Sequence, residues 1–256
     1  MLDVHPPHES VHTWRDFFIH IATIVVGLII AVGLEQTVEH FQHRHQRHEL
    51  EAAIHRDCEA NQKYIEGDIA TTEAVLDWAT EQASTVEQAK PAGPLAIPQM
   101  PQGSFGSPDA GVWPSAKASG TTTLLPPSAQ NWLEYLASRD NETFEAPEGA
   151  SAQLFSAYAM FDRTLLGHAK ETPSGQLDLS TLPPAQRVEA VESLRSIAEQ
   201  ARNLLRSLLI YKAGNEYILS TRWDQLDTPE GGERYTEIFA QDKNAHPKVR
   251  FAFGSN

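Results

Sequence analysis

The chain is poor in cysteine and in positive charge, and both shortages limit the kinds of site and partner that it can have. Cys58 is the only cysteine, so an intrachain disulfide is excluded and a thiolate metal site is not expected. Asp and Glu number 34 against 20 Lys and Arg. Nucleic acids and anionic membrane surfaces both select clustered basic residues, so neither is a predicted partner.

The sequence also lacks the short motifs that carry most catalytic chemistry. It has no G-x-S-x-G elbow, P-loop, dinucleotide fingerprint, H-E-x-x-H or C-x-x-C. The carboxylate pairs Glu35/Glu39 and Glu189/Glu192 have helical spacing on polar faces, where solvated charges are expected. Cys58 falls in an apolar seam, which is typical of a buried thiol. We therefore predict no catalytic residue, no cofactor and no enzyme activity.

One long apolar run is present at residues 17–34, after a short amino-terminal tail at residues 1–16. It reads FFIHIATIVVGLIIAVGL and contains no Asp, Glu, Lys or Arg. As a helix it is about 27 Å long, which matches the hydrocarbon thickness of a bilayer. Trp14 and Arg15 precede it, at the depth where interface anchors occur. We predict one transmembrane helix, with the lipid bilayer as its surroundings.

Two other interpretations of this run stay open. A buried helix of a soluble protein has similar composition, and Ala31-Val32-Gly33 has the small-x-small form of a signal-peptide cleavage site. Orientation is nearly undecided, because Arg15 precedes the run while Arg44 and Arg47 follow it. We favour a bacterial inner-membrane protein with its soluble region in the periplasm, since acidic residues border the exit side.

Small residues recur along one face of the predicted membrane helix. Thr23, Gly27 and Ala31 are four residues apart, a spacing that lets two membrane helices approach closely. We expect a homo-oligomer or a membrane-protein partner. Ordinary small residues of a membrane helix are the alternative.

Helical periodicity continues after the membrane, at residues 35–89, where there is no proline. We predict that the membrane helix continues as one long helix with a heptad-like, coiled-coil seam; a break near residues 42–48 is the alternative. The seam residues are Ile65, Ile69, Thr72, Leu76, Ala79, Ala83 and Val86.

Composition changes at residues 90–127, which hold eight prolines. We predict a long Pro/Gly-rich loop there, with Val112 and Trp113 available to pin it. Residues 128–220 return to helical patterning, with helices near 128–138, 151–170 and 181–219, the last one capped by Thr181. Met160 and Phe161 are expected in the core. Residues 221–256 are polar, and Gly231-Gly232 indicates a loosely held tail.

These segments predict an all-α fold: a single amino-terminal transmembrane helix continuing into a long helix, an antiparallel helical bundle and a long Pro/Gly-rich loop. No strand set is expected. The last long helix has the clearest seam, made of Leu194, Ile197, Ala201, Leu204, Leu208, Tyr211, Asn215 and Ile218.

Histidine is unevenly placed, with nine of the eleven in the first 55 residues. His40/His43 and His45/His48 are i,i+3 pairs, a spacing that can share a metal ion. The two pairs point in different directions on one helix, so a metal site needs a second chain or another element. We favour a solvated segment that meets lipid headgroups; a pH-responsive segment and a metal site at His40, His43, His45 and His48 are the alternatives.

The stretch from Thr13 to Gln46 resembles the amino-terminal signature of uncharacterised bacterial single-pass membrane proteins, chiefly through IVVGLIIA at residues 24–31 with Glu35 and Glu39. A weaker likeness runs from Trp113 to Gly120 and on to Leu124-Leu125-Pro126 and Tyr135. The resemblance implies a membrane anchor with a helical soluble domain. That family has no established activity, so no catalytic residue is implied.

The function we predict is a membrane-anchored helical interaction or scaffold protein that self-associates. The rival is a periplasmic sensory module that binds a ligand or a metal.

Overall fold

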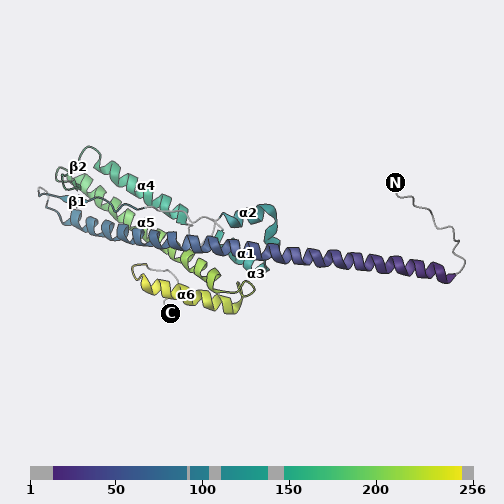
Figure 1. Ribbon diagram of the computed structural model, residues 1–256. Helices are drawn as coiled ribbons and strands as arrows, with labels where there is room; N and C mark the ends of the chain where they lie inside the picture. Colours follow the sequence, from purple (N-terminus) through teal and green to yellow (C-terminus); the bar gives the residue numbers. More distant parts are fainter. Residues whose placement is uncertain (1–13, 91–92, 104–110, 138–146, 250–256) are drawn as a thin grey trace, which may run out of the picture. The chain divides into compact units, whose positions relative to one another are not determined.

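The computed structural model describes residues 14–90, 93–103, 111–137 and 147–249 (Figure 1). The chain divides into two units, residues 1–49 and residues 50–256. Helix α1, Trp14–Gln88, has 75 residues and belongs to both units. It is helical through residues 42–48, so the predicted long helix is confirmed and the break does not occur.

The second unit is an antiparallel bundle, which confirms the predicted all-α fold. Its long helices are the later part of α1, α4 (Pro147–Leu165) and α5 (Pro184–Ser220), and α5 runs opposite to the other two (Figure 1). Every seam residue predicted between Ile65 and Val86 is buried. The seam of α5 is buried as well, apart from Tyr211, which is half-buried. Each helix therefore buries one apolar stripe against the others.

A second, smaller core is built by shorter helices against α1 and α5. These are α2 (Val112–Ser119), the 3-10 turn η1 (Thr121–Leu124), α3 (Pro127–Ala137) and α6 (Pro229–Ala245). The residues of this core include Ile54, Cys58, Trp113, Leu125, Leu133, Tyr217, Leu226 and Ile238.

The Pro/Gly-rich segment is more ordered than the sequence indicates. Strand β1 (Ala96–Pro98) lies in it, and the Trp78 indole Nε1 donates to the Pro98 carbonyl at 2.9 Å. Helix α2 tolerates Pro114 because the first turn of a helix needs no backbone donor there. Gly120 ends α2 at a φ of 75°, a left-handed conformation that favours glycine. Trp113 is buried, as predicted for a pinning residue.

A small three-stranded sheet contradicts the expectation of no strands. β2 (Lys170–Glu171) and β3 (Gln176–Asp178) form a hairpin, and β1 pairs antiparallel with the other side of β3. Each strand has two or three residues, which is too short to show an alternating pattern. The sheet joins the chain between α4 and α5 to the segment that follows α1.

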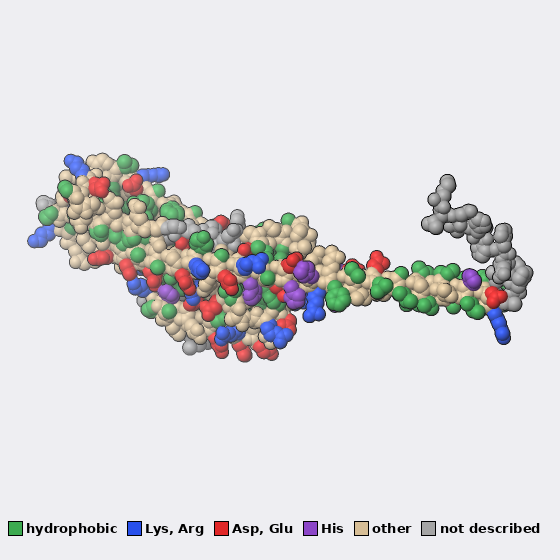
Figure 2. Space-filling view, in the orientation of Figure 1, with side chains coloured by type: hydrophobic (Ala, Val, Ile, Leu, Met, Phe, Trp, Pro, Cys, Tyr) green, Lys and Arg blue, Asp and Glu red, His purple; other side chains and the backbone are tan. Residues whose placement is uncertain are grey.

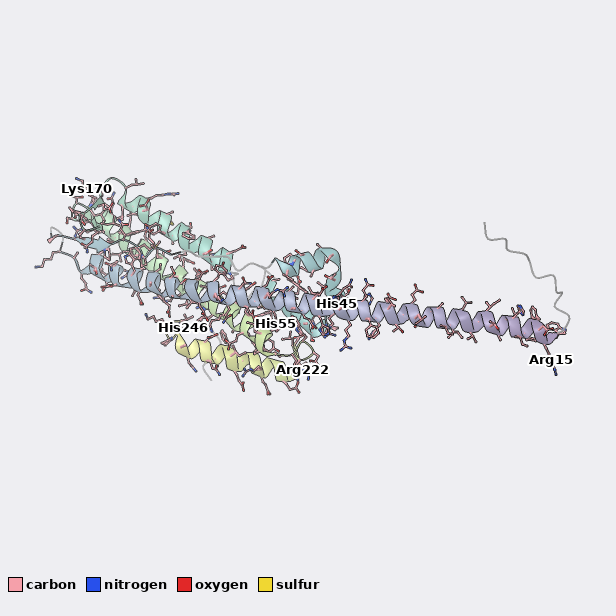
Figure 3. The ribbon with its side chains drawn as sticks, in the orientation of Figure 1. Arg15, His45, His55, Lys170, Arg222 and His246 are labelled. Atoms are coloured by element: carbon pink, nitrogen blue, oxygen red, sulfur yellow. The ribbon has the colours of Figure 1, made fainter. Side chains whose placement is uncertain are left out.

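The carboxyl-terminal segment was predicted as a loosely held tail, and this was wrong for the described part. Thr228 caps α6, accepting from the Gly231 N–H at 3.2 Å, and Pro229 occupies the first helical position. Ile238 is buried on α5. The His246 ring Nδ1 lies 2.8 Å from the Glu73 carboxylate of α1 (Figure 3).

Two other predictions fail for local reasons. Thr181 does not cap α5, because its hydroxyl donates to the His168 carbonyl while the helix begins at Pro184. Met160 is not in the core: its side chain is 59% exposed, whereas Phe161 is 1% exposed. Met160 is one position off the buried stripe of α4, and one residue turns a side chain by about 100°.

Candidate functional site

The first part of α1 carries a candidate membrane span. It contains one window of 18 residues that is long and apolar enough to cross a membrane, and none of that window is buried by the protein (Figure 2). A buried core helix is therefore excluded for this segment. On the small-residue face the Thr23 hydroxyl donates to the Ile19 carbonyl at 2.9 Å, and a side chain at Gly27 would meet nothing within 4 Å. The face is open along this part of the helix.

The histidines predicted as metal ligands, His40, His43, His45 and His48, are all exposed on α1. Within the described ranges, no three His, Cys, Asp or Glu side chains are placed to hold one metal ion. His45 Nε2 lies 3.2 Å from the Glu49 carboxylate, one turn along the helix. One copy of the chain thus does not bring His40, His43, His45 and His48 together, and the metal site stays a prediction that needs further ligands.

Cys58 lines a cavity of about 50 Å³ beneath α2 and α3. Burial, with the nearby charges of Asp57 and Glu59, raises the pKa of the Cys58 thiol to about 12. The thiol is therefore protonated near neutral pH and is a poor nucleophile. Asn215 Nδ2 is buried in the same lining and has no hydrogen-bond partner. The cavity has room for a few water molecules.

One groove on the surface of the bundle lies between α4 and α5, and we call it the α4–α5 groove. It has a volume of about 410 Å³. Its lining is Met160, Arg163, Thr164, Glu189, Glu192, Ser193 and Ser196. Met160 is exposed, and Arg163 and Glu189 form no ion pair within the described ranges. The groove therefore combines an exposed apolar side chain with unpaired charges of both signs.

The second groove lies between the end of α1 and the start of α5, and we call it the α1–α5 groove. It has a volume of about 300 Å³. Its lining is Val86, Glu87, Ala89, Pro184, Arg187, Val188, Val191, Glu192 and Arg195. Arg195 and Glu87 form an ion pair across it, in which Nη2 of Arg195 donates to both carboxylate oxygens of Glu87 at 2.8 and 2.9 Å.

Arg187 at the base of the α1–α5 groove is 8% exposed. Its Nε donates to the Leu182 carbonyl, Nη1 to the Lys90 carbonyl and Nη2 to the Ser180 carbonyl, at 3.1, 2.9 and 3.3 Å. The guanidinium thus links the segment that follows α1 to the segment that precedes α5 through their backbone carbonyl oxygens.

Neither groove was predicted from the sequence. Both depend on how α1, α4 and α5 pack, which a single helical pattern does not define. A signal did exist for Arg187, because it lies three residues before Ala190 and seven before Leu194, on an extension of the buried stripe. A charged residue at a seam position marks either a structural clamp or a binding site.

Comparison with known proteins gives no relative of this chain: no family model, no curated protein and no solved structure matches it.

Proposed function

We propose that this chain is a membrane-anchored helical protein that self-associates and acts as an interaction or scaffold protein. The observation that carries the proposal is the α4–α5 groove, which pairs an exposed Met160 with unpaired Arg163 and Glu189. A two-fold contact between copies places the same surface on both sides, so that Arg163 of each copy meets Glu189 of the other. Anchoring in one bilayer raises the effective concentration of the copies.

The membrane segment supports the same proposal. Helices with small residues four apart pack closely in lipid, and the face of Thr23, Gly27 and Ala31 is open. We place the protein in a bacterial inner membrane with its second unit in the periplasm. The acidic residues Glu35 and Glu39 after the apolar run, together with the likeness to bacterial single-pass membrane proteins, support this placement.

Charge exchange in the α4–α5 groove tests self-association. R163E and E189R each replace attraction by repulsion at both halves of a two-fold contact, and the double variant R163E/E189R restores opposite charges. We expect each single variant to lower the crosslinked dimer in native membranes by about fivefold or more, and the double variant to recover it.

The matched control is R56E, which makes the same charge change at an exposed position of α1. It should leave the dimer unchanged. Wild-type protein that yields only monomer, or an R56E variant that behaves like R163E, would contradict the proposal.

Thiol labelling tests the orientation. Cys58 is buried and protonated, so it does not react under mild conditions, and A74C supplies one exposed thiol in the second unit. We expect a membrane-impermeant maleimide to label A74C in intact spheroplasts. Labelling only after lysis would place the second unit in the cytoplasm and leave the interaction proposal standing.

A second candidate function is ligand binding by a periplasmic module. The α1–α5 groove favours it, because about 300 Å³ is within the range of small-molecule sites and a charged group lies at its base.

A further inference from the structure

Arg187 is a buried cation without an anion. Charged side chains are rarely buried unless they are paired, because removing the charge from water costs free energy. Hydrogen bonds to backbone carbonyls recover only part of that cost. No carboxylate within the described ranges forms an ion pair with Arg187, and the guanidinium donates there to three backbone carbonyl oxygens. An arginine carries five N–H donors, so two of them remain for another acceptor.

The groove above Arg187 has apolar walls. Val86 and Val191 are buried in it, while Val188 is 60% exposed at its mouth. The neighbouring Arg195 is already neutralised by Glu87, which leaves Arg187 as the unpaired cation of this lining. The site also adjoins the first turn of α5, where the helix dipole adds positive potential.

We infer that the α1–α5 groove binds a carboxylate attached to an apolar body, such as a short fatty acid or the carboxyl-terminal end of a peptide with an apolar last residue. The carboxylate takes the two remaining N–H donors of Arg187, a planar pair that suits carboxylate geometry. The apolar body packs on Val86, Val188 and Val191. The inference rests on the ligand-binding candidate and does not require self-association.

Of the two lining carboxylates, Glu87 is paired with Arg195, and Glu192 is the one whose charge opposes such a ligand. It is exposed, lines the rim and has no charged partner within the described ranges. Its carboxylate repels an incoming carboxylate through solvent. Removing this charge should therefore strengthen binding, a result that a general loss of structure would not produce.

The test titrates full-length protein in neutral-lipid nanodiscs with hexanoate, and with hexanol and hexylamine as probes of the same body without the acid. A second arm uses the peptide acetyl-Gly-Ser-Gly-Val with a free acid or an amide end. Calorimetry, corrected by empty nanodiscs, should show one saturable site per chain for at least one acid. The corresponding alcohol or amide should bind about tenfold or more weakly.

Four variants, one of them the control E66Q, separate ligand recognition from folding. V188D puts a carboxylate at the groove mouth on an already exposed position, and we expect it to weaken the acid about tenfold without lowering the thermal midpoint. E192Q should strengthen binding of the acid about two- to fivefold, whereas E66Q, a change at an exposed position of α1, should leave binding unchanged. R187K keeps the charge but loses the planar pair, and should weaken the acid.

The two arms also identify the source of the ligand. Hexanoate binding without peptide binding indicates a free acid, and the reverse indicates a peptide end. The inference is overturned if neither acid saturates, if hexanol binds as well as hexanoate, or if V188D has no effect. The titration is repeated in R163E, so that loss of self-association and loss of ligand binding are distinguished.

Discussion

Helix α1 contains two stretches that carry apolar residues in opposite ways. From residue 17 to 34 they occupy every face and all are exposed. From Ile54 to Val86 they occupy one stripe, which is buried in the bundle. A helix that is apolar all round needs an apolar solvent all round, whereas a one-sided stripe needs a protein surface. The same secondary structure thus serves two different environments, and the pattern of side chains tells them apart.

The largest predicted effect concerns insertion of the apolar run at residues 17–34 into a membrane. V26K/I30K puts two ammonium groups at the centre of the apolar run, at a cost of about 2.5–3.5 kcal/mol each for membrane insertion. We expect the variant to be lost from the alkali-resistant membrane fraction, as measured by carbonate extraction. V26L/I30L is the matched control and should stay in the membrane. Membrane-retained V26K/I30K protein would contradict a spanning role.

The next largest effect concerns the stability of the bundle core. F161A removes a fully buried ring that packs edge-to-face on Trp78, with 6.0 Å between ring centroids. We expect it to lower the free energy of unfolding by about 3–5 kcal/mol in denaturant titrations. M160A, the adjacent but exposed position, should change it by less than about 0.5 kcal/mol. Equal effects at the two positions would mean that the orientation of α4 is wrong.

The buried Cys58 thiol makes the stability of the bundle depend on pH. The unfolded Cys58 loses its proton near pH 9, whereas burial keeps the native thiol protonated up to about pH 12. Between these values the unfolded state binds fewer protons, so stability falls as pH rises. Relative to C58A, wild-type protein should lose up to about 4 kcal/mol over this window. A difference between the two proteins that does not change with pH would show that the thiol is exposed.

The smallest effect concerns neighbouring glycines in α6. A methyl group at Gly231 would overlap the Tyr217 hydroxyl and the Gln225 carbonyl, while one at Gly232 would meet nothing within 4 Å. G231A should therefore lower the free energy of unfolding by about 1–3 kcal/mol. G232A should raise it by about 0.5–1 kcal/mol, because alanine favours the helix. If G231A is neutral or stabilising, α6 is not packed on α5 as described.

Sequence patterns predicted the long elements well and the short ones poorly. Four-three spacing over many turns identified the buried stripes of α1 and α5, because an error at one position does not change the trend. Helix α6 was missed because its composition is polar: Thr228 caps it, and Ile238 is its one buried apolar side chain beside the buried Gly231 and Asp242. The three-stranded sheet was missed for two reasons. The hairpin of β2 and β3 has strands of only two and three residues, and the pairing of β1 with β3 joins segments about 80 residues apart, which no local pattern reports.

The candidate site was less predictable than the fold. Arg187 carries a visible anomaly, a charge on a buried stripe, but its role depends on carbonyls of Lys90, Ser180 and Leu182 that meet only in the folded chain. The α4–α5 groove depends on Met160 lying one position outside the stripe. Spacing alone placed Met160 in the core, because a methionine beside a phenylalanine fits either side of that boundary.

Site-directed spin labelling along α1 distinguishes a stretch that faces lipid from one that faces the bundle. Nitroxides placed one at a time from residue 17 to 34 and from 54 to 86 report contact with lipid-soluble oxygen and with a water-soluble nickel chelate. We expect high oxygen access along the first stretch, lowered only on the face of Thr23, Gly27 and Ala31, where two copies pack against each other. In the second stretch we expect low access to both reagents at the stripe positions, repeating every three or four residues. Nickel access throughout the first stretch, or low access to both reagents at positions away from that face, would contradict a segment surrounded by lipid.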